Sequence, residues 1–436
     1  MAMINAYTGQ SSTLSDEERA LIARREAALG PAYRLFYQNP VHFVRGEGSK
    51  LYDADGNAYL DAYNNVASVG HSNPRVVEAI AKQAAILNTH TRYLNEVVIG
   101  YAERLLSKFP RELAHVMFTC TGSEANDLAV RVAKSYTGGT GFIVTELAYH
   151  GVTDAVSQMS PSLGKFVNLG EHVRTVPAPD SFRVPVDELG AYFARGVHAA
   201  IADMERHGIK PAAMIVDTIF SSDGVFVDPK GFLRDAVAEV QKAGALFIAD
   251  EVQPGFGRTG DALWGFERHG LKPDMVSLGK PMGNGHPIAG LVLRHDVIDN
   301  FGRNSRYFNT FGGNPVSCAA GMAVLDVIEQ QELQQNAKAV GAYLADNLRA
   351  LAKRHPEIAD VRGAGLFLGV EIIPRSASIA ADALTTKVVN GLRERRVLIS
   401  ATGPRANVLK IRPPLVFSKA DADTLTQALE EVLKTP

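Results

Sequence analysis

Short apolar runs alternate with segments of helical periodicity between about residue 75 and residue 330. The segments between the runs, such as residues 128–133 and 233–243, place apolar side chains at helical spacing. Alternation of this kind is typical of a mostly parallel β-sheet covered by helices, so we expect an α/β fold. The runs expected to form strands are residues 115–119, 141–144, 213–216, 246–249, 275–278 and 289–293.

The pattern changes on either side of this region. Residues 1–74 contain a hairpin signal, a turn at 53–56 between two short apolar strands, and should pack on the C-terminal part as an N-terminal segment. We therefore expect a large domain over residues 75–330 and a smaller α+β domain over 331–436. The elements expected towards the C-terminus are a helix at 315–354, strands near 360–361 and at 366–372, a helix at 381–395, a strand at 408–411 and a helix at 420–434, capped by Ser418 and Asp421.

Composition and net charge limit the classes of binding partner that the protein is expected to have. The 436-residue chain is 46% hydrophobic and 21% charged, which is typical of a globular protein with more than one domain. A net charge of -2 disfavours nucleic acids and acidic membrane surfaces, so a small molecule is the expected partner. No run approaches the roughly 20 apolar residues of a membrane helix, and the N-terminal stretch is polar, so we expect a cytoplasmic protein.

Cysteine and histidine spacings indicate no metal site. Cys120 and Cys318 stand alone in apolar contexts, which favours neither a disulfide framework nor zinc. The histidines at 71, 90, 150 and 286 also lack the spacing of metal ligands.

An acid and a lysine each close a predicted strand. Asp250 follows residues 246–249, and Lys280 follows 275–278, so both should emerge at the carboxyl edge of the sheet. A partly desolvated lysine forms a Schiff base readily, and a nearby carboxylate keeps a pyridine nitrogen protonated. Taken singly, an edge aspartate and a solvated lysine explain the two positions equally well.

Two further segments reach the same edge. Thr121 and Glu124 form a capping box, and Gly122 lets the backbone approach a ligand, so the helix start suits a phosphate; a merely well-capped helix is the alternative. Tyr149 could stack on a flat ring or remain a rim tyrosine. The G-x-G-x-x-G pattern at 255–260 lacks a following helix and a downstream acid, so we reject a dinucleotide site and expect a loop around Asp250.

Three motifs together resemble the class III aminotransferases, pyridoxal-phosphate enzymes of fold type I. They are ADEVQPGFGRTG (249–260), SLGK (277–280) and NTFGGNP (309–315), within a resemblance that runs from residue 46 to residue 432. The resemblance implies pyridoxal 5'-phosphate as cofactor and a homodimer with active sites at the subunit interface. By this resemblance, Lys280 forms the covalent bond to the cofactor aldehyde, and Asp250 pairs with the nitrogen of the cofactor's pyridine ring. The other implied contacts are Gln253 to the ring hydroxyl, Val252 and Tyr149 to the ring faces, Gly122 and Ser123 to the phosphate, and Thr310 to the phosphate of the neighbouring subunit.

The chain departs from the usual family pattern at two positions. Asp217 stands where Glu-Pro is common, which implies a shortened or absent glutamate switch. Lys410 stands where members that use α-carboxylates carry arginine, and lysine lacks the planar fork that grips a carboxylate. A standard α-amino acid donor is therefore disfavoured, although Arg412 could compensate.

Several stretches are similar to the ethanolamine-phosphate phospho-lyases, which keep the aminotransferase fold but eliminate phosphate. They are YNNVASVGH (63–71), LNTHTR (87–92), GKPMGNGHP (279–287), SATGP (400–404) and NVLKIRPP (407–414). We therefore expect release of phosphate and ammonia from O-phosphoethanolamine or a similar amine, with an ω-aminotransferase that uses pyruvate or a similar keto acid as the alternative. The candidates for holding the substrate phosphate, each equally consistent with an ordinary salt-bridge residue, are Asn65, Arg92, Lys410 and Arg412.

Overall fold

The computed structural model describes residues 3–11, 13–64, 66–376 and 378–434. Its largest sheet has seven strands in the order β4-β10-β9-β8-β7-β5-β6. Neighbouring strands are parallel except at β10, which runs antiparallel to β4 and β9. The strands are β4 (His115–Thr119), β5 (Gly141–Thr145), β6 (Val173–Val176), β7 (Pro211–Asp217), β8 (Leu246–Asp250), β9 (Met275–Leu278) and β10 (Ala289–Leu293).

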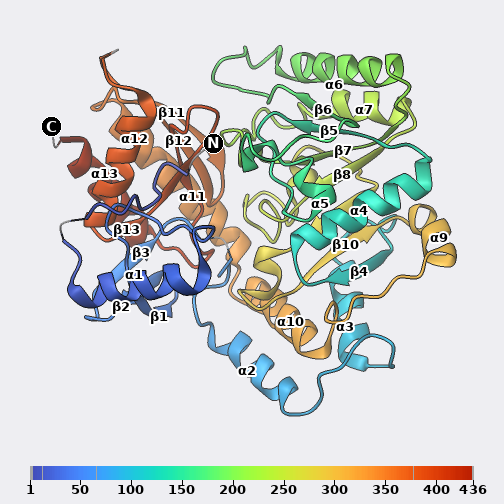
Figure 1. Cartoon of the computed structure of the whole chain (residues 1–436), viewed down its shortest axis with the longest axis horizontal. Helices are drawn as coiled ribbons and strands as arrows, with labels where there is room; N and C mark the ends of the chain where they lie inside the picture. Colours follow the sequence, from blue (N-terminus) through green and yellow to red (C-terminus); the bar gives the residue numbers. More distant parts are fainter. Residues whose placement is uncertain (1–2, 12, 65, 377, 435–436) are drawn as a thin grey trace.

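All six predicted strands of this sheet are confirmed, and β6 is the one that the apolar pattern missed. The strands are buried on both faces because helices cover the sheet on each side (Figure 1). Consecutive side chains serve different cores: Phe247 belongs to the larger hydrophobic cluster and Ile248 to the second one. The helices from residue 74 to residue 304 are α2 (Pro74–Ala84), α3 (Glu96–Leu106), α4 (Gly122–Thr137), α5 (Asp154–Ser157), α6 (Leu189–Arg206), α7 (Arg234–Lys242), α8 (Gly265–Arg268) and α9 (His295–Asn304), with 3-10 turns η1 (Pro161–Leu163) and η2 (Lys280–Gly283).

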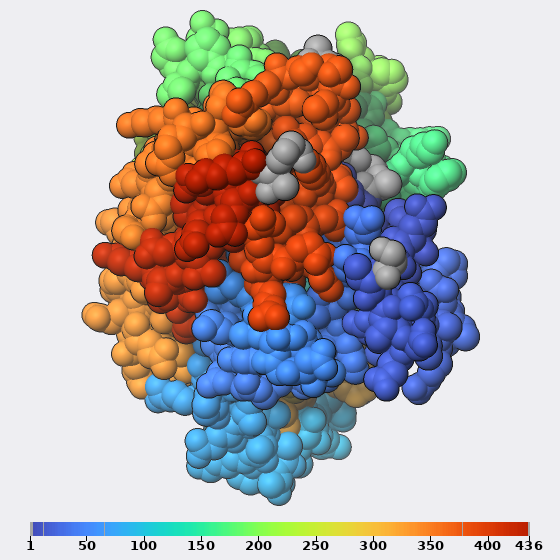
Figure 2. All heavy atoms as spheres, turned by 90° about the vertical axis from the view of Figure 1, so that its left-hand side faces the viewer, coloured from blue at the N-terminus to red at the C-terminus, as the bar shows by residue number. Residues whose placement is uncertain are grey.

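The two ends of the chain build the smaller part of the molecule together. Strand β3 pairs in parallel with β13, so that Leu60 lies opposite Val397, and both views show the N-terminal and C-terminal segments side by side (Figures 1 and 2). Two four-stranded sheets result, with the orders β1-β2-β3-β13 and β11-β12-β15-β14. Their strands are β1 (Phe43–Glu47), β2 (Lys50–Asp53), β3 (Ala58–Asp61), β11 (Ile358–Ala364), β12 (Phe367–Ile372), β13 (Val397–Leu398), β14 (Ser400–Thr402) and β15 (Val408–Ile411).

The helices of this part largely follow the predicted pattern. The first, α1 (Asp16–Leu29), has no buried residue. The single helix predicted at 315–354 is wrong: α10 and α11 are separated at Glu332, whose φ of 50° is left-handed and ends helical propagation. The Ser418–Asp421 cap is confirmed. These helices are α10 (Pro315–Gln330), α11 (Leu333–Ala352), α12 (Ala381–Glu394) and α13 (Lys419–Lys434).

The domain boundaries at residues 74/75 and 330/331 stay a prediction, and α10 and α11 pack against each other across the second of them. The carboxyl ends of β4, β5, β7, β8 and β9 meet at one edge of the large sheet, where ligands of open α/β sheets bind. Among the helices of the described residues, none is long and apolar enough to cross a membrane.

Candidate active site

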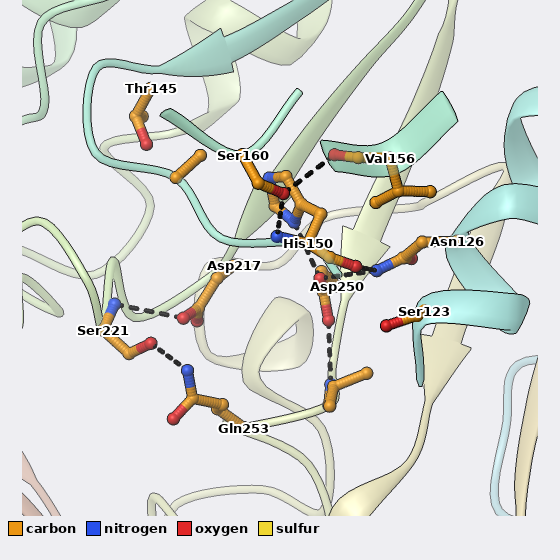
Figure 3. A network of polar contacts seen from close by, with 12 residues as sticks. Ser123, Asn126, Thr145, His150, Val156, Ser160, Asp217, Ser221, Asp250 and Gln253 are labelled. Carbon is orange, nitrogen blue, oxygen red and sulfur yellow. Dashed lines mark hydrogen bonds and ion pairs between the residues drawn. The ribbon is translucent and has the colours of Figure 1, made fainter. Parts of the chain in front are cut away.

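A cavity of about 450 Å³ opens at this edge of the large sheet. Seven of the eight residues predicted to bind the cofactor line it, together with four residues that were not predicted. The lining residues are Gly122, Ser123, Asn126, Tyr149, His150, Gly151, Asp217, Asp250, Val252, Gln253 and Lys280. Figure 3 shows most of them converging from the ends of different strands and from the start of α4.

The start of α4 forms one wall of the cavity. The Thr121 hydroxyl accepts a hydrogen bond from the Glu124 N–H, and the Glu124 carboxylate accepts one from the Thr121 N–H, so the predicted capping box is confirmed. A Cβ atom on Gly122 would lie 3.0 Å from the Val252 side chain, so only a small residue fits there without a shift of Val252. The loop at Gly151 approaches α4 more closely still, because a Cβ on Gly151 would meet the Ser123 hydroxyl at 2.5 Å.

Asp250 is held by three donors at the floor of the cavity. Its Oδ2 lies 2.7 Å from His150 Nδ1 and accepts from Asn126 Nδ2 at 2.9 Å, while Oδ1 accepts from the Val252 N–H (Figure 3). Burial alone would raise the pKa of Asp250, but the hydrogen bond with His150 and the electrostatic interaction between the two side chains lower it below the ordinary value. The carboxylate therefore stays ionised where a cationic ring nitrogen could pair with it.

Glu251, the acid next to Asp250 along the chain, has its hydrogen-bonding partners outside the cavity. Glu251 is fully buried and accepts hydrogen bonds from the N–H groups of Gly265 and Phe266 and from the Thr218 hydroxyl. Burial raises its pKa to about 8. Glu251 therefore caps α8, whereas Asp250 lines the cavity.

Lys280 faces the cavity from a strained backbone. Its φ of 35° is rare for a residue with a side chain, and such strain persists only where surrounding structure enforces it. The amine lies 6.0 Å from the centre of the Tyr149 ring, which is 37% exposed. Burial, followed by the Arg412 guanidinium, lowers the pKa of Lys280 to about 8, so the neutral nucleophilic amine forms near neutral pH.

A second cavity meets the first at Lys280 and is bordered by Arg412 and Tyr63. The Arg412 guanidinium lies 4.3 Å from the centre of the Tyr63 ring and donates to the Tyr63 carbonyl oxygen at 2.9 Å. It also donates to Oε1 of Gln253, whose Nε2 donates to the Ser221 hydroxyl. Gln253 therefore connects Arg412 to the first cavity.

Asp217 and Lys410 supply further buried charges near this junction. Asp217 accepts hydrogen bonds from the N–H groups of Ile219 and Ser221, and burial raises its pKa. Lys410 is only 6% exposed, and burial lowers its pKa well below that of an ordinary lysine. Asp217 was noted in the sequence only as a departure from the family pattern, yet the structure places it in the cavity wall.

Arg92, Thr310 and Lys410, which were also predicted for the site, line neither of these two cavities. Arg92 lies 3.7 Å from the Phe308 ring centre and borders a separate cavity, and Thr310 is exposed nearby. Their roles stay predictions, because this region of a single chain lacks any neighbouring subunit. Asn65 lies outside the described residues.

The loop at 255–260 behaves differently from the expectation. Gly257 and Gly260 approach Gln334 and Lys338 of α11, so the loop packs on that helix, and only the preceding Val252 and Gln253 reach the cavity. Both cysteines are free, and no group of three or more potential metal ligands occurs in the described part of the chain.

The fold and cavity define an α/β enzyme of fold type I. The family model of class III aminotransferases matches residues 35–433, and the chain belongs to this family. A phospholyase from Arthrobacter, solved in complex with phosphoethanolamine, is 44% identical and superimposes with a TM-score of 0.92, covering 95% of this chain and 100% of that one.

Curated relatives carry names of both kinds. Ethanolamine-phosphate phospho-lyase homolog 1 of Caenorhabditis elegans is 36% identical over 434 residues, 95% of this chain and 93% of that protein. Alanine–glyoxylate aminotransferase 2 homolog 2, mitochondrial, of Arabidopsis thaliana is 39% identical over 431 residues, 97% of this chain and 88% of that protein. The family is therefore shown, while these names divide between two reactions.

The cavity fits the pyridoxal phosphate that the family implies. Asp250 offers an ionised acceptor, and Lys280 offers an amine of lowered pKa. The N-terminal N–H groups of α4 beside Gly122 suit an anion, and a Cβ at that position would lie within 3.0 Å of the Val252 side chain. Asn126 and His150, which sequence reasoning missed as site residues, complete the floor; the position of His150 directly after Tyr149 was the available signal.

Proposed function

We propose that the protein binds pyridoxal 5'-phosphate and catalyses elimination of phosphate and ammonia from O-phosphoethanolamine, or from a similar phosphorylated amine, to give an aldehyde. Lys280 would hold the cofactor aldehyde, Asp250 its ring nitrogen, Gly122 and Ser123 its phosphate. When bound, the cofactor supplies an electron sink for the carbon next to the amine.

The observation that carries the proposal is the set of neutral groups around the Arg412 guanidinium. Among the described residues, no carboxylate pairs with its guanidinium, which instead contacts the Gln253 amide and the Tyr63 carbonyl and ring. An arginine with neutral partners beside Lys280 retains its capacity to bind an anion of the substrate. A phosphate one carbon away from the amine-bearing carbon suits this position.

The residues of the chain then divide the work. The freed Lys280 amine removes a proton from the carbon that bears the nitrogen, for which its pKa of about 8 suits it as a general base. Asp250 keeps the ring nitrogen protonated, and Arg412 holds the departing phosphate. Lys410, Arg92 and Asn65 remain further candidates for contacts with the phosphate.

An amino-group transfer is the second candidate. The planar fork of Arg412 suits a carboxylate as well as a phosphate, and the Arabidopsis relative is named an aminotransferase. An ω-aminotransferase would require pyruvate or a similar acceptor, whereas the elimination requires none.

We infer a homodimer with active sites at the subunit interface. Large apolar side chains surround the region of Arg92 and Thr310: Tyr93 is 65%, Leu94 97% and Phe311 70% exposed. An apolar surface of this kind is typical of an interface, and burying it would bring Thr310 of one subunit towards the cavity of the other. The cytoplasm stays the expected compartment, although the Arabidopsis relative is named mitochondrial.

The proposal is tested by incubating the cofactor-loaded protein with O-phosphoethanolamine, with and without pyruvate, and assaying inorganic phosphate. We expect phosphate release at the same rate in both mixtures and none from the Lys280→Ala variant. Turnover of an ω-amine with pyruvate, without phosphate release in either mixture, would establish the aminotransferase instead.

A further inference from the structure

Lys410 is a buried lysine that has no hydrogen-bonding partner for its amine among the described residues. In the residues that the structure describes, its amine forms no hydrogen bond or ion pair, and it lies 5.8 Å from the centre of the Phe367 ring. Burying an amine is unfavourable unless another group compensates it. The energetic cost therefore indicates that Lys410 acts on something the chain itself does not provide.

The small-domain sheet places Lys410 near the end of β15, two residues before Arg412. On β15 it lies between Gly369 of β12, which has no side chain, and Ser400 of β14. Lys410 and Arg412 are two residues apart, so their side chains leave the same side of the strand. Arg412 borders the cavity that Lys280 shares, and the Lys410 amine lies close enough for the charges of Arg412, Asp217 and Lys280 to shift its pKa.

Elimination of phosphate requires a proton donor. When the C–O bond of a phosphate monoester dianion breaks, its electron pair stays on the bridging oxygen, and without a proton the product would be the strongly basic phosphate trianion. Proton transfer from a positioned acid removes this barrier. Arg412 cannot supply the proton, because a guanidinium does not deprotonate in proteins.

We propose that the Lys410 ammonium protonates the bridging oxygen of the substrate phosphate as the C–O bond breaks. The inference rests on the proposed phospho-lyase function. The electron pair left by the proton on the neighbouring carbon forms the new C=C bond, the C–O pair takes the Lys410 proton, and hydrogen phosphate dianion leaves. Lys410 is left neutral and regains a proton from water, while Lys280 retains the carbon-derived proton until the product is released.

The charged groups around Lys410 suit a proton donor that is charged only with substrate bound. Burial, then the Arg412 guanidinium, lower the pKa of Lys410; Lys280 lowers it further, and Asp217 and Asp223 oppose the shift. A bound phosphate dianion adds negative charge, so it raises the pKa of Lys410 again and draws a proton onto the amine. Binding of the substrate phosphate thereby creates the Lys410 ammonium that later protonates it.

The test compares two esters of ethanolamine that differ in the basicity of the leaving group. O-phosphoethanolamine needs the proton, whereas 2-aminoethyl hydrogen sulfate releases sulfate, a weak base that needs none. In the holoenzyme, we expect Lys410→Gln to lower phosphate release about 100-fold or more and first-turnover sulfate release by less than about 10-fold. Sulfate release also shows that the variant is folded and loaded, and Lys242→Gln, an exposed lysine of α7, is the matched control.

Lys410→Arg separates holding the phosphate from protonating it. It keeps the positive charge but not the acid, so KM for O-phosphoethanolamine and the affinity for inorganic phosphate, measured by calorimetry, should stay within about threefold while kcat falls about 100-fold. The fall in kcat at high pH that reports a protonated Lys410 should also vanish in this variant.

Each result decides the matter. Equal losses for the two esters in Lys410→Gln, or full kcat in Lys410→Arg, would overturn the proton transfer and leave the phospho-lyase function intact. No phosphate release from the parent protein would overturn the proposed function, and the proton transfer with it.

Discussion

Two cavities meet at Lys280 and differ in how their charges are compensated. At the end that holds Asp250, the carboxylate meets His150 and two N–H donors, whereas at the end that holds Arg412 the cation meets an amide, a carbonyl oxygen and a ring. At the first, compensated end, hydrogen bonds from the chain balance the charge of Asp250 and keep the carboxylate ionised. At the second, under-compensated end, no carboxylate of the described residues balances the charge of Arg412, so this charge is available to a ligand. A permanent cofactor suits the former, and an anionic substrate that comes and goes suits the latter.

The largest effect is expected from removing the charge at the compensated end. Asp250→Asn replaces the ionised acceptor by a neutral amide, so the ring nitrogen loses its protonating partner, and kcat for phosphate release should fall about 10³-fold. Glu251→Gln is the matched control, since this neighbouring acid caps α8, and its kcat should change by less than about threefold. Comparable losses in the two variants would contradict the division between these acids.

Supplying a charge at the under-compensated end should have the next largest effect. Gln253→Glu places a carboxylate against Arg412, which then competes with the substrate phosphate, and Arg412→Gln removes the cation altogether. KM for O-phosphoethanolamine should rise about 30-fold or more in either variant. A KM unchanged in both would show that the anion binds elsewhere.

The part of this contrast that the sequence predicts is the compensated end. Asp250, Lys280 and Tyr149 follow predicted strands, and Gly122 opens a capped helix, so local patterns alone are enough to place them at one edge of the sheet. The six central strands follow from the same patterns. Asn126 escaped prediction because nothing in the sequence distinguishes it from other polar residues inside a helix.

The under-compensated end depends on contacts between distant segments. Arg412 is 349 positions from Tyr63 and 159 from Gln253, so both hydrogen bonds form only between segments that the fold brings together. Charge and motif similarity are enough to select Arg412 and Lys410 as candidates. They do not predict that neither residue pairs with a carboxylate among the described residues, because this depends on the folded surroundings. The break at Glu332 escaped prediction because residues 329–332 are all glutamate or glutamine, which favour a helix and carry no stop signal.

Lys280 lies where the two cavities meet, and the pH dependence of its reaction with the cofactor aldehyde should give an effect of intermediate size. Attachment of the cofactor aldehyde needs the neutral amine, so its rate on the cofactor-free protein should rise about tenfold per pH unit below a pKa of about 8 and level off above it. Arg412 lowers this pKa, so Arg412→Gln should move the midpoint to higher pH. Stopped-flow absorbance measures both, and a midpoint that moves to lower pH would contradict the assignment.

The smallest effect should come from Ser221→Ala. The hydroxyl accepts from Gln253, and its loss removes one neutral hydrogen bond from the link between Arg412 and the first cavity. KM should rise about two- to tenfold with kcat nearly unchanged. Steady-state kinetics check this, and a loss as large as that of Arg412→Gln would mean that the link, and not the cation, determines binding.

The central claim is that this aminotransferase scaffold completes a catalytic cycle with a phosphorylated amine alone. The direct measurement is the amount of phosphate and ammonia formed per active site from O-phosphoethanolamine with no keto acid present. The account predicts many turnovers with phosphate and ammonia in equal amounts. A reaction that stops after one equivalent of amine is consumed, and resumes only when pyruvate is added, would contradict it.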